Sequence, residues 1–195
     1  MHDDLWLRWG GRLPPFVGRD GEWKALDAAL ERSLKYQAPQ FVTLLGQAGI
    51  GKSRLVDEWL ADLGSRGAFR VVRASARTTS TSAPGALFGA LLRDRFGLDE
   101  GLDPRDAFGI FRDQLQVVFG DRRVGEVAGL LGRYLGLEPP ESPLGHALAG
   151  RPEQEAALAR AVLARFLEDD AVRKRGVFAL DDLQLADDES LAELE

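Results

Sequence analysis

The chain has 195 residues, 45% hydrophobic and 29% charged, which predicts one soluble globular domain of ordinary composition. Its 25 basic and 31 acidic residues give a formal net charge of −6, which argues against a domain that coats nucleic acid or lies on a membrane surface. With no cysteine and two histidines, disulfides and Cys-ligated metals are excluded, and a Ser-His-Asp triad is not expected. No signal peptide or membrane-length apolar run is visible, so we expect a cytoplasmic protein.

The first part of the chain predicts one helix followed by a strand–helix–strand unit. A lead-in at 1–15 ends in two prolines, and Asp20 is the expected N-cap of the first helix. The expected elements are a helix at about 21–37, a strand at 41–45, a helix at about 51–63 and a strand at 69–74. Strand, helix and strand in this order imply a right-handed crossover and a parallel sheet.

A polar loop at 77–85 leads into a stretch that is expected to be helical, apart from a Pro- and Gly-rich loop at 138–152. The apolar spacing predicts helices around 87–92, from about 104, around 124–135 and from 152 to about 172. The short apolar run at 177–181 then predicts a strand. Asp187 is the expected N-cap of a last helix.

One segment between the strand at 41–45 and the helix at 51–63 matches the pattern G-x-x-x-x-G-K-[S/T]. It consists of Gly46, Gln47, Ala48, Gly49, Ile50, Gly51, Lys52 and Ser53. Glycines allow the backbone N–H groups of such a loop to surround phosphate oxygens at the start of a helix. Lys52 would supply positive charge to the β- and γ-phosphates, and the Ser53 hydroxyl is an oxygen ligand for Mg²⁺. The segment predicts a phosphate-binding loop, or P-loop.

The strand at 177–181 ends in two acids, Asp181 and Asp182. A P-loop needs a carboxylate at the end of a neighbouring strand to hold Mg²⁺ through its water shell, and we assign that role to Asp181. A second acid can orient the attacking water and accept its proton, and we assign that role to Asp182. Strands often end in aspartate for structural reasons alone, so the assignment depends on the P-loop.

Three blocks of the sequence together resemble the AAA+-related signal-transduction ATPases with numerous domains (the STAND group). The resemblance is closest to the origin-recognition-complex-like AAA ATPase domain of bacterial regulators. The blocks are Phe16-Val17-Gly18-Arg19-Asp20, the P-loop followed by Arg54-Leu55, and Ala179-Leu180-Asp181-Asp182-Leu183-Gln184-Leu185-Ala186-Asp187 followed by Ser190-Leu191. They fall in the order that the family has and span about 16–194.

The resemblance implies an α/β fold, a three-layer P-loop NTPase with a parallel sheet of the additional-strand class. The chain would be the N-terminal portion of that domain: a lead-in at 1–15, then an incomplete ATPase domain at 16–195 with a helical insert at about 84–172. In this class a further strand separates the P-loop strand from the acidic strand, so those two should not pair. The strand at 69–74 should pair with the acidic strand instead. Direct pairing of the strand at 41–45 with 177–181 would favour a kinase-like order.

The resemblance also implies ATP or ADP and Mg²⁺ as ligands, with Phe16 and Val17 against the adenine and Arg54 in the nucleotide-binding set. Plain core packing is the alternative for Phe16 and Val17, and Arg19 is open between a nucleotide contact and an ion pair. In the full-length protein, Lys52 and Asp182 would be catalytic, in an ATPase that works as a conformational switch in signalling or transcription regulation, whereas this portion alone is expected to be inactive.

The expected partners are the nucleotide, the remainder of a larger chain and like subunits, with no membrane and no direct nucleic-acid contact. The alternatives are a non-hydrolysing nucleotide-binding scaffold for protein–protein contacts and a DNA-contacting, initiator-like ATPase.

Overall fold

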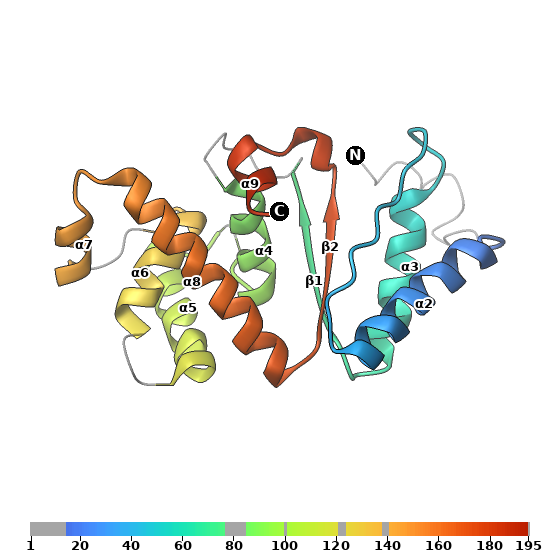
Figure 1. Ribbon diagram of the computed structural model, residues 1–195, viewed down its shortest axis with the longest axis horizontal. Coiled ribbons are helices and arrows are strands. Elements are labelled where there is room, and N and C mark those ends of the chain that lie inside the picture. Colours follow the sequence, from blue (N-terminus) through green and yellow to red (C-terminus); the bar gives the residue numbers. More distant parts are fainter. Residues whose placement is uncertain (1–14, 77–84, 100, 121–123, 138–140, 195) are drawn as a thin grey trace. The chain divides into compact units, whose positions relative to one another are not determined.

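The computed structural model of the chain describes residues 15–76, 85–99, 101–120, 124–137 and 141–194, in two units that divide between Asp62 and Leu63 (Figure 1). The first unit holds α2 (Asp20–Tyr36) and most of α3 (Lys52–Ser65). The second holds β1 (Arg70–Ser75), α4 (Ala86–Phe96), α5 (Pro104–Phe119), α6 (Val124–Leu135), α7 (Pro143–Leu148), α8 (Pro152–Arg173), β2 (Gly176–Asp181), the 3-10 turn η1 (Leu183–Leu185) and α9 (Asp188–Ala192). The lead-in at 1–15 lies outside the described residues except for Pro15.

The first unit follows the predicted helices closely. Trp59 of α3 donates from Nε1 to Asp27 Oδ1 of α2 at 2.9 Å, and its ring is buried, as is Leu26 on α2. The prediction that Asp20 caps α2 is wrong. Arg19 occupies the cap in a left-handed conformation with no side-chain cap bond, and Asp20 is the first helical residue. An acid in the first turn still interacts favourably with the positive end of the helix dipole, which explains the aspartate there.

The segment 41–45, which the sequence predicted to be a strand, is neither helix nor strand. A strand is defined by ladder hydrogen bonds to a neighbour, and a strand of a parallel sheet is buried on both faces. Here the side chains of Phe41 and Leu45 are 83% and 88% exposed. The apolar run therefore identified a segment of low polarity and not a strand.

The sheet of the second unit, as far as the structure describes it, pairs β1 with β2 in parallel. The register runs from Arg70 opposite Gly176 to Ser75 opposite Asp181, which confirms that the strand predicted at 69–74 pairs with the acidic strand. Val72 and Leu91 belong to one buried cluster that joins β1 to α4. Because parallel strands end at the same edge, Ser75 and Asp181 share the carboxyl edge of this sheet.

Between the two strands the described residues are mainly helical, as predicted. Helices α4, α5, α6 and α8 pack around one core, whose largest fully buried side chains are Leu92, Phe111, Leu115, Leu131 and Phe166. Helices α4 and α6 approach closely at Gly89, where an added Cβ would lie 2.1 Å from the carbonyl oxygen of Tyr134. No helix in the described segments is long and apolar enough to cross a membrane.

One helix lies where a loop was predicted. Helix α7 falls within 138–152, with Pro143 in its first turn and Ser142 as its N-cap. The Ser142 Oγ accepts the Gly145 N–H at 3.0 Å. A serine followed by proline is typical of the start of a helix. The loop was predicted because the whole segment 138–152 is rich in glycine and proline.

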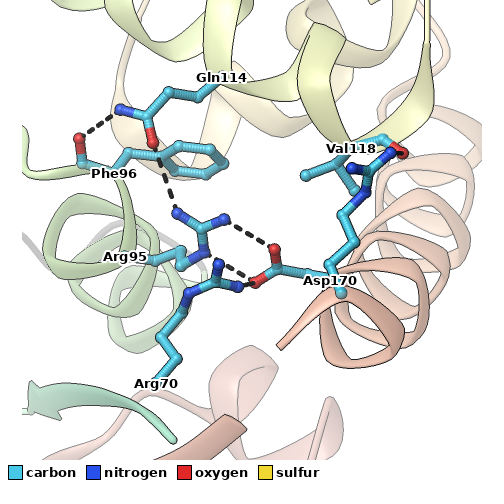
Figure 2. A network of polar contacts seen from close by, with 7 residues as sticks. Arg70, Arg95, Phe96, Gln114, Val118 and Asp170 are labelled. Atoms are coloured by element: carbon cyan, nitrogen blue, oxygen red, sulfur yellow. Dashed lines mark hydrogen bonds and ion pairs between the residues drawn. The ribbon is translucent and has the colours of Figure 1, made fainter. Parts of the chain in front are cut away.

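A buried charged network joins the start of β1 to α4, α5 and α8 (Figure 2). Asp170 accepts two hydrogen bonds from Arg95, each of 2.7 Å, and also forms an ion pair with Arg70. Gln114 lies on the other side of Arg95 and donates to the carbonyl of Phe96 at 2.9 Å. Burial raises the pKa of Asp170, but the hydrogen bonds from both arginines outweigh burial, so the pKa lies below its ordinary value.

Candidate functional site

The P-loop runs directly into the amino terminus of α3, which begins at Lys52. Gly49 and Gly51 have φ values of 80° and 94°, a left-handed backbone that residues with a Cβ rarely adopt. The other loop residues, Gly46, Gln47, Ala48 and Ile50, are exposed together with Ser53. The loop is thus an open, glycine-dependent turn at the positive end of a helix, as the motif predicts.

Lys52 folds back onto its own loop. Its Nζ donates to the carbonyl oxygens of Gly46 and Gln47, at 2.9 and 3.1 Å. An ammonium carries three donors and one full charge. The charge of Lys52 therefore lies beside the loop carbonyls and close to the partial positive charge of the α3 amino terminus. This concentration of positive charge suits a polyphosphate.

The block around Phe16 packs beside the P-loop. Arg19 donates from Nη2 to the Ile50 carbonyl at 2.7 Å and from Nη1 to Glu22 at 2.7 Å, and this bond from Arg19 holds the pKa of Glu22 below its ordinary value. Of the two roles left open for Arg19, the structure shows the ion pair. The structure also shows the bond from Arg19 to the Ile50 carbonyl of the P-loop, which the sequence did not predict. No pattern in a sequence relates a side chain to a backbone carbonyl 31 residues away.

Phe16 and Val17, predicted to lie against adenine, differ in exposure. The Phe16 ring is half-buried, with its centroid 6.0 Å from that of Trp23 and the Arg54 guanidinium 5.8 Å above it. Val17 is 78% exposed. The core-packing alternative therefore describes part of the Phe16 environment, whereas the Val17 side chain is open to a ligand.

The acidic strand end lies in the second unit. Asp181 is the last residue of β2, is exposed, and accepts the Asp182 N–H on Oδ1 at 2.8 Å. Asp182 has φ 55°, an uncommon conformation for a residue with a Cβ, and its Oδ1 accepts a bond from Gln184 at 3.0 Å. Backbone strain of this kind is concentrated at functional sites, which makes the turn after β2 a candidate for chemistry.

Each of the two units offers an oxygen donor of a kind that Mg²⁺ binds. Ser53 of the first unit offers a hydroxyl oxygen and Asp181 of the second unit offers a carboxylate at a strand end, and both residues are exposed. Within the described parts of the chain, no three His, Cys, Asp or Glu side chains gather into a metal cage. Mg²⁺ at phosphoryl-transfer sites uses one or two carboxylates, water and the substrate's phosphates rather than a protein cage, so a hydroxyl and a carboxylate are donors of the kind that it takes.

Comparisons with known proteins agree with this chemistry. A family model described as the AAA ATPase domain matches residues 15–195, which is most of the chain. Neither the curated proteins nor the solved structures that were compared give a match. The matched range includes the Phe16 block, the P-loop and the acidic strand end. The chain therefore belongs to the AAA ATPase domain family, whose members are α/β P-loop proteins that bind ATP with Mg²⁺.

Proposed function

We propose that this chain binds Mg·ATP and acts as a nucleotide-dependent conformational switch in a larger signalling or regulatory protein of the STAND group. The observation that carries the proposal is Lys52, whose ammonium is bonded to the carbonyls of Gly46 and Gln47 at the amino terminus of α3. The match to the AAA ATPase domain supports the nucleotide as ATP. The origin-recognition-complex-like subtype and the switch role rest on the sequence resemblance.

Each site residue has a proposed task. The loop amides and the α3 amino terminus bind the phosphates, and Lys52 offsets the charge that develops on the transferred phosphoryl group. Ser53 and Asp181 would hold Mg²⁺, which when bound neutralises phosphate charge. Asp182 orients the attacking water and accepts its proton.

The remaining site residues complete the nucleotide pocket in this proposal. Val17 and Phe16 contact the base, and Arg54 keeps the Phe16 ring in place from above. We also propose the three-layer architecture of the additional-strand class for the domain at 16–195, with the helices between β1 and β2 as its insert. The pairing of β1 with β2 is in accord with that strand order.

Calorimetric titration of the full chain with ATP, with and without Mg²⁺, tests the proposal. Lys52→Ala should abolish binding and leave the far-UV circular dichroism spectrum unchanged, because Lys52 bonds to an exposed loop. Lys24→Ala is the matched control, since Lys24 is an exposed lysine of α2 and should have no effect. Equal ATP affinity of Lys52→Ala and the parent would contradict the proposal. Binding without any turnover in a single-turnover assay of the full-length protein would replace the switch with a non-hydrolysing scaffold.

A further inference from the structure

The segment after the acidic strand is hydrogen-bonded to the start of α4. Asp187 Oδ1 accepts the Gly85 N–H at 2.9 Å, although the two residues are 102 positions apart. Ser190 donates from Oγ to Asp187 Oδ2 at 2.6 Å and accepts the Leu87 N–H on the same oxygen at 3.2 Å. Ser190, Gly85 and Leu87 are all buried. We refer to these four residues as the clamp.

The clamp supplies what the amino terminus of α4 lacks. The first N–H groups of a helix have no partner within the helix, and a Ser, Thr, Asp or Asn cap normally provides one. The cap of α4 is Gly85, which has no side chain. Asp187 and Ser190 therefore cap α4 from another element, while Asp187 also caps its own helix α9 through the Ser190 N–H at 2.9 Å.

The electrostatics of Asp187 agree with this double capping. Burial raises the pKa of its carboxyl, but the bonds from Ser190 and from the Gly85 amide outweigh burial and leave the pKa below its ordinary value. A carboxylate near the positive ends of two helices is favoured in its charged form. Asp187 is thus a charged carboxylate whose two oxygens accept hydrogen bonds from Gly85 and Ser190.

The clamp lies at one end of a short segment whose other end holds the two acids. At the carboxyl edge of the sheet, the Asp181 carbonyl accepts the Ala76 N–H at 3.1 Å. Between this bond and Asp187, Leu183 and Ala186 pack against the cluster of β1 and α4. The segment 181–190 is therefore fixed at one end to the end of β1 and at the other end to the start of α4.

This fixation bears on Asp182. Its left-handed backbone is strained for a residue with a Cβ and persists only where the surroundings over-determine it. The residue is followed by η1, so only a short turn separates it from Asp187. Loss of the clamp would free one end of that turn, and the strain at Asp182 would then be able to relax.

We propose that Asp187 and Ser190 are positioning residues, which hold Asp181 and Asp182 in place by clamping the turn after β2 to the start of α4. The inference rests on the proposed function of those two acids. The clamp residues themselves touch neither nucleotide nor metal in this proposal. They act through the backbone of 182–186.

The test compares Asp187→Asn and Ser190→Ala with the same changes at two other helix caps. Asp103 caps α5 through the Arg105 N–H at 2.9 Å, and Ser142 caps α7, so Asp103→Asn and Ser142→Ala remove the same groups elsewhere. In the full-length protein the clamp variants should lower kcat for ATP hydrolysis by about 10- to 100-fold, the range for a small misplacement of catalytic groups. They should also reduce the gain in ATP affinity that Mg²⁺ gives, whereas ATP affinity in EDTA stays at the parental value.

The controls should change neither kcat nor the effect of Mg²⁺. Parental kcat and a parental Mg²⁺ effect in the clamp variants would overturn the inference and leave the proposed function standing. A parent chain that does not bind Mg·ATP would overturn both. Should Asp187→Asn fail to fold, Ser190→Ala decides, because it keeps the carboxylate and removes one hydroxyl. Hydrogen exchange that accelerates at 182–186 in Ser190→Ala, and not in Ser142→Ala, would support the inference independently of activity.

Discussion

Asp170, at the edge of the sheet where β1 begins, and Asp181, at the edge where β2 ends, are carboxylates in opposite surroundings. Asp170 is 4% exposed, and both of its oxygens are bonded to arginines of other elements (Figure 2). Asp181 is exposed and bonds to the amide of the next residue. A buried carboxylate saturated by two guanidinium groups stabilises the fold, whereas an exposed one at a strand end can bind a ligand. The amino edge of the sheet is thus a structural joint, and the carboxyl edge is the place for chemistry.

The largest effect is expected at the carboxyl edge. In the full-length protein, Asp182→Asn should lower the rate of ATP hydrolysis by about 10²–10⁴-fold, as loss of a water-orienting base does, and should keep Mg·ATP binding. Asparagine also tolerates a left-handed backbone, so the free energy of unfolding should change by less than about 0.5 kcal/mol. Single-turnover hydrolysis and urea unfolding measure the two effects. Normal hydrolysis would show that the roles of the two acids are wrongly assigned.

At the amino edge the balance should reverse. Asp170→Asn removes the charge that compensates Arg95, whose side chain is 10% exposed, and should lower the free energy of unfolding by about 3–5 kcal/mol. Asp113→Asn is the control, because the Arg112–Asp113 pair is at the surface and such pairs contribute about 0–1 kcal/mol. Urea unfolding of the three proteins gives both numbers. A similar small loss in both variants would contradict the structural role of the network.

Asp181→Asn separates metal binding from catalysis at the carboxyl edge. If Asp181 holds Mg²⁺ through water, the apparent Mg²⁺ affinity of the ATP complex should fall by about 10–100-fold, the range for outer-shell partners of a metal. ATP affinity in EDTA should remain that of the parent. Titration with Mg²⁺ at fixed ATP measures the change. An unaltered Mg²⁺ requirement would move the metal role to another residue.

The smallest effect concerns pH. Burial raises the pKa of Asp170 and the arginines lower it further than that, so the folded pKa lies below that of the unfolded chain. Its contribution to stability is therefore complete above the ordinary aspartate pKa of about 4 and is lost as the pH falls through the folded value. The difference in unfolding free energy between parent and Asp170→Asn should shrink below about pH 4. A difference that stays constant to the lowest accessible pH would contradict the assigned cause.

The sequence predicted the carboxyl edge better than the amino edge. The acidic strand end and the Asp187 cap are local patterns, as is the P-loop of the first unit. Local patterns can be recognised in a sequence because their residues act within a few positions of one another. Asp170 carries no such pattern. Its neighbour Asp169 is also an aspartate of α8, but Asp170 is buried and pairs with Arg95 of α4, whereas Asp169 pairs with Arg165 of its own helix. The difference depends on how α8 packs in the fold, which the sequence does not display.

The mistakes have the same origin. The run at 41–45 has the composition of a buried strand, but a strand is a relation between two segments, and composition describes one. The clamp escaped notice for the same reason. Asp187 was identified as the cap of its own helix, while its bond to Gly85 depends on an element more than 100 residues away.

The parallel pairing of β1 with β2 has a consequence for the order of folding. Arg70 lies opposite Gly176, and the whole helical core is connected between them. Closing a loop of roughly 100 residues costs entropy that grows as (3/2)RT ln n, and contacts this far apart slow folding. We therefore expect the helices to assemble first and shorten the effective loop, so that the sheet and the carboxylates at its edge take their places in the last stage.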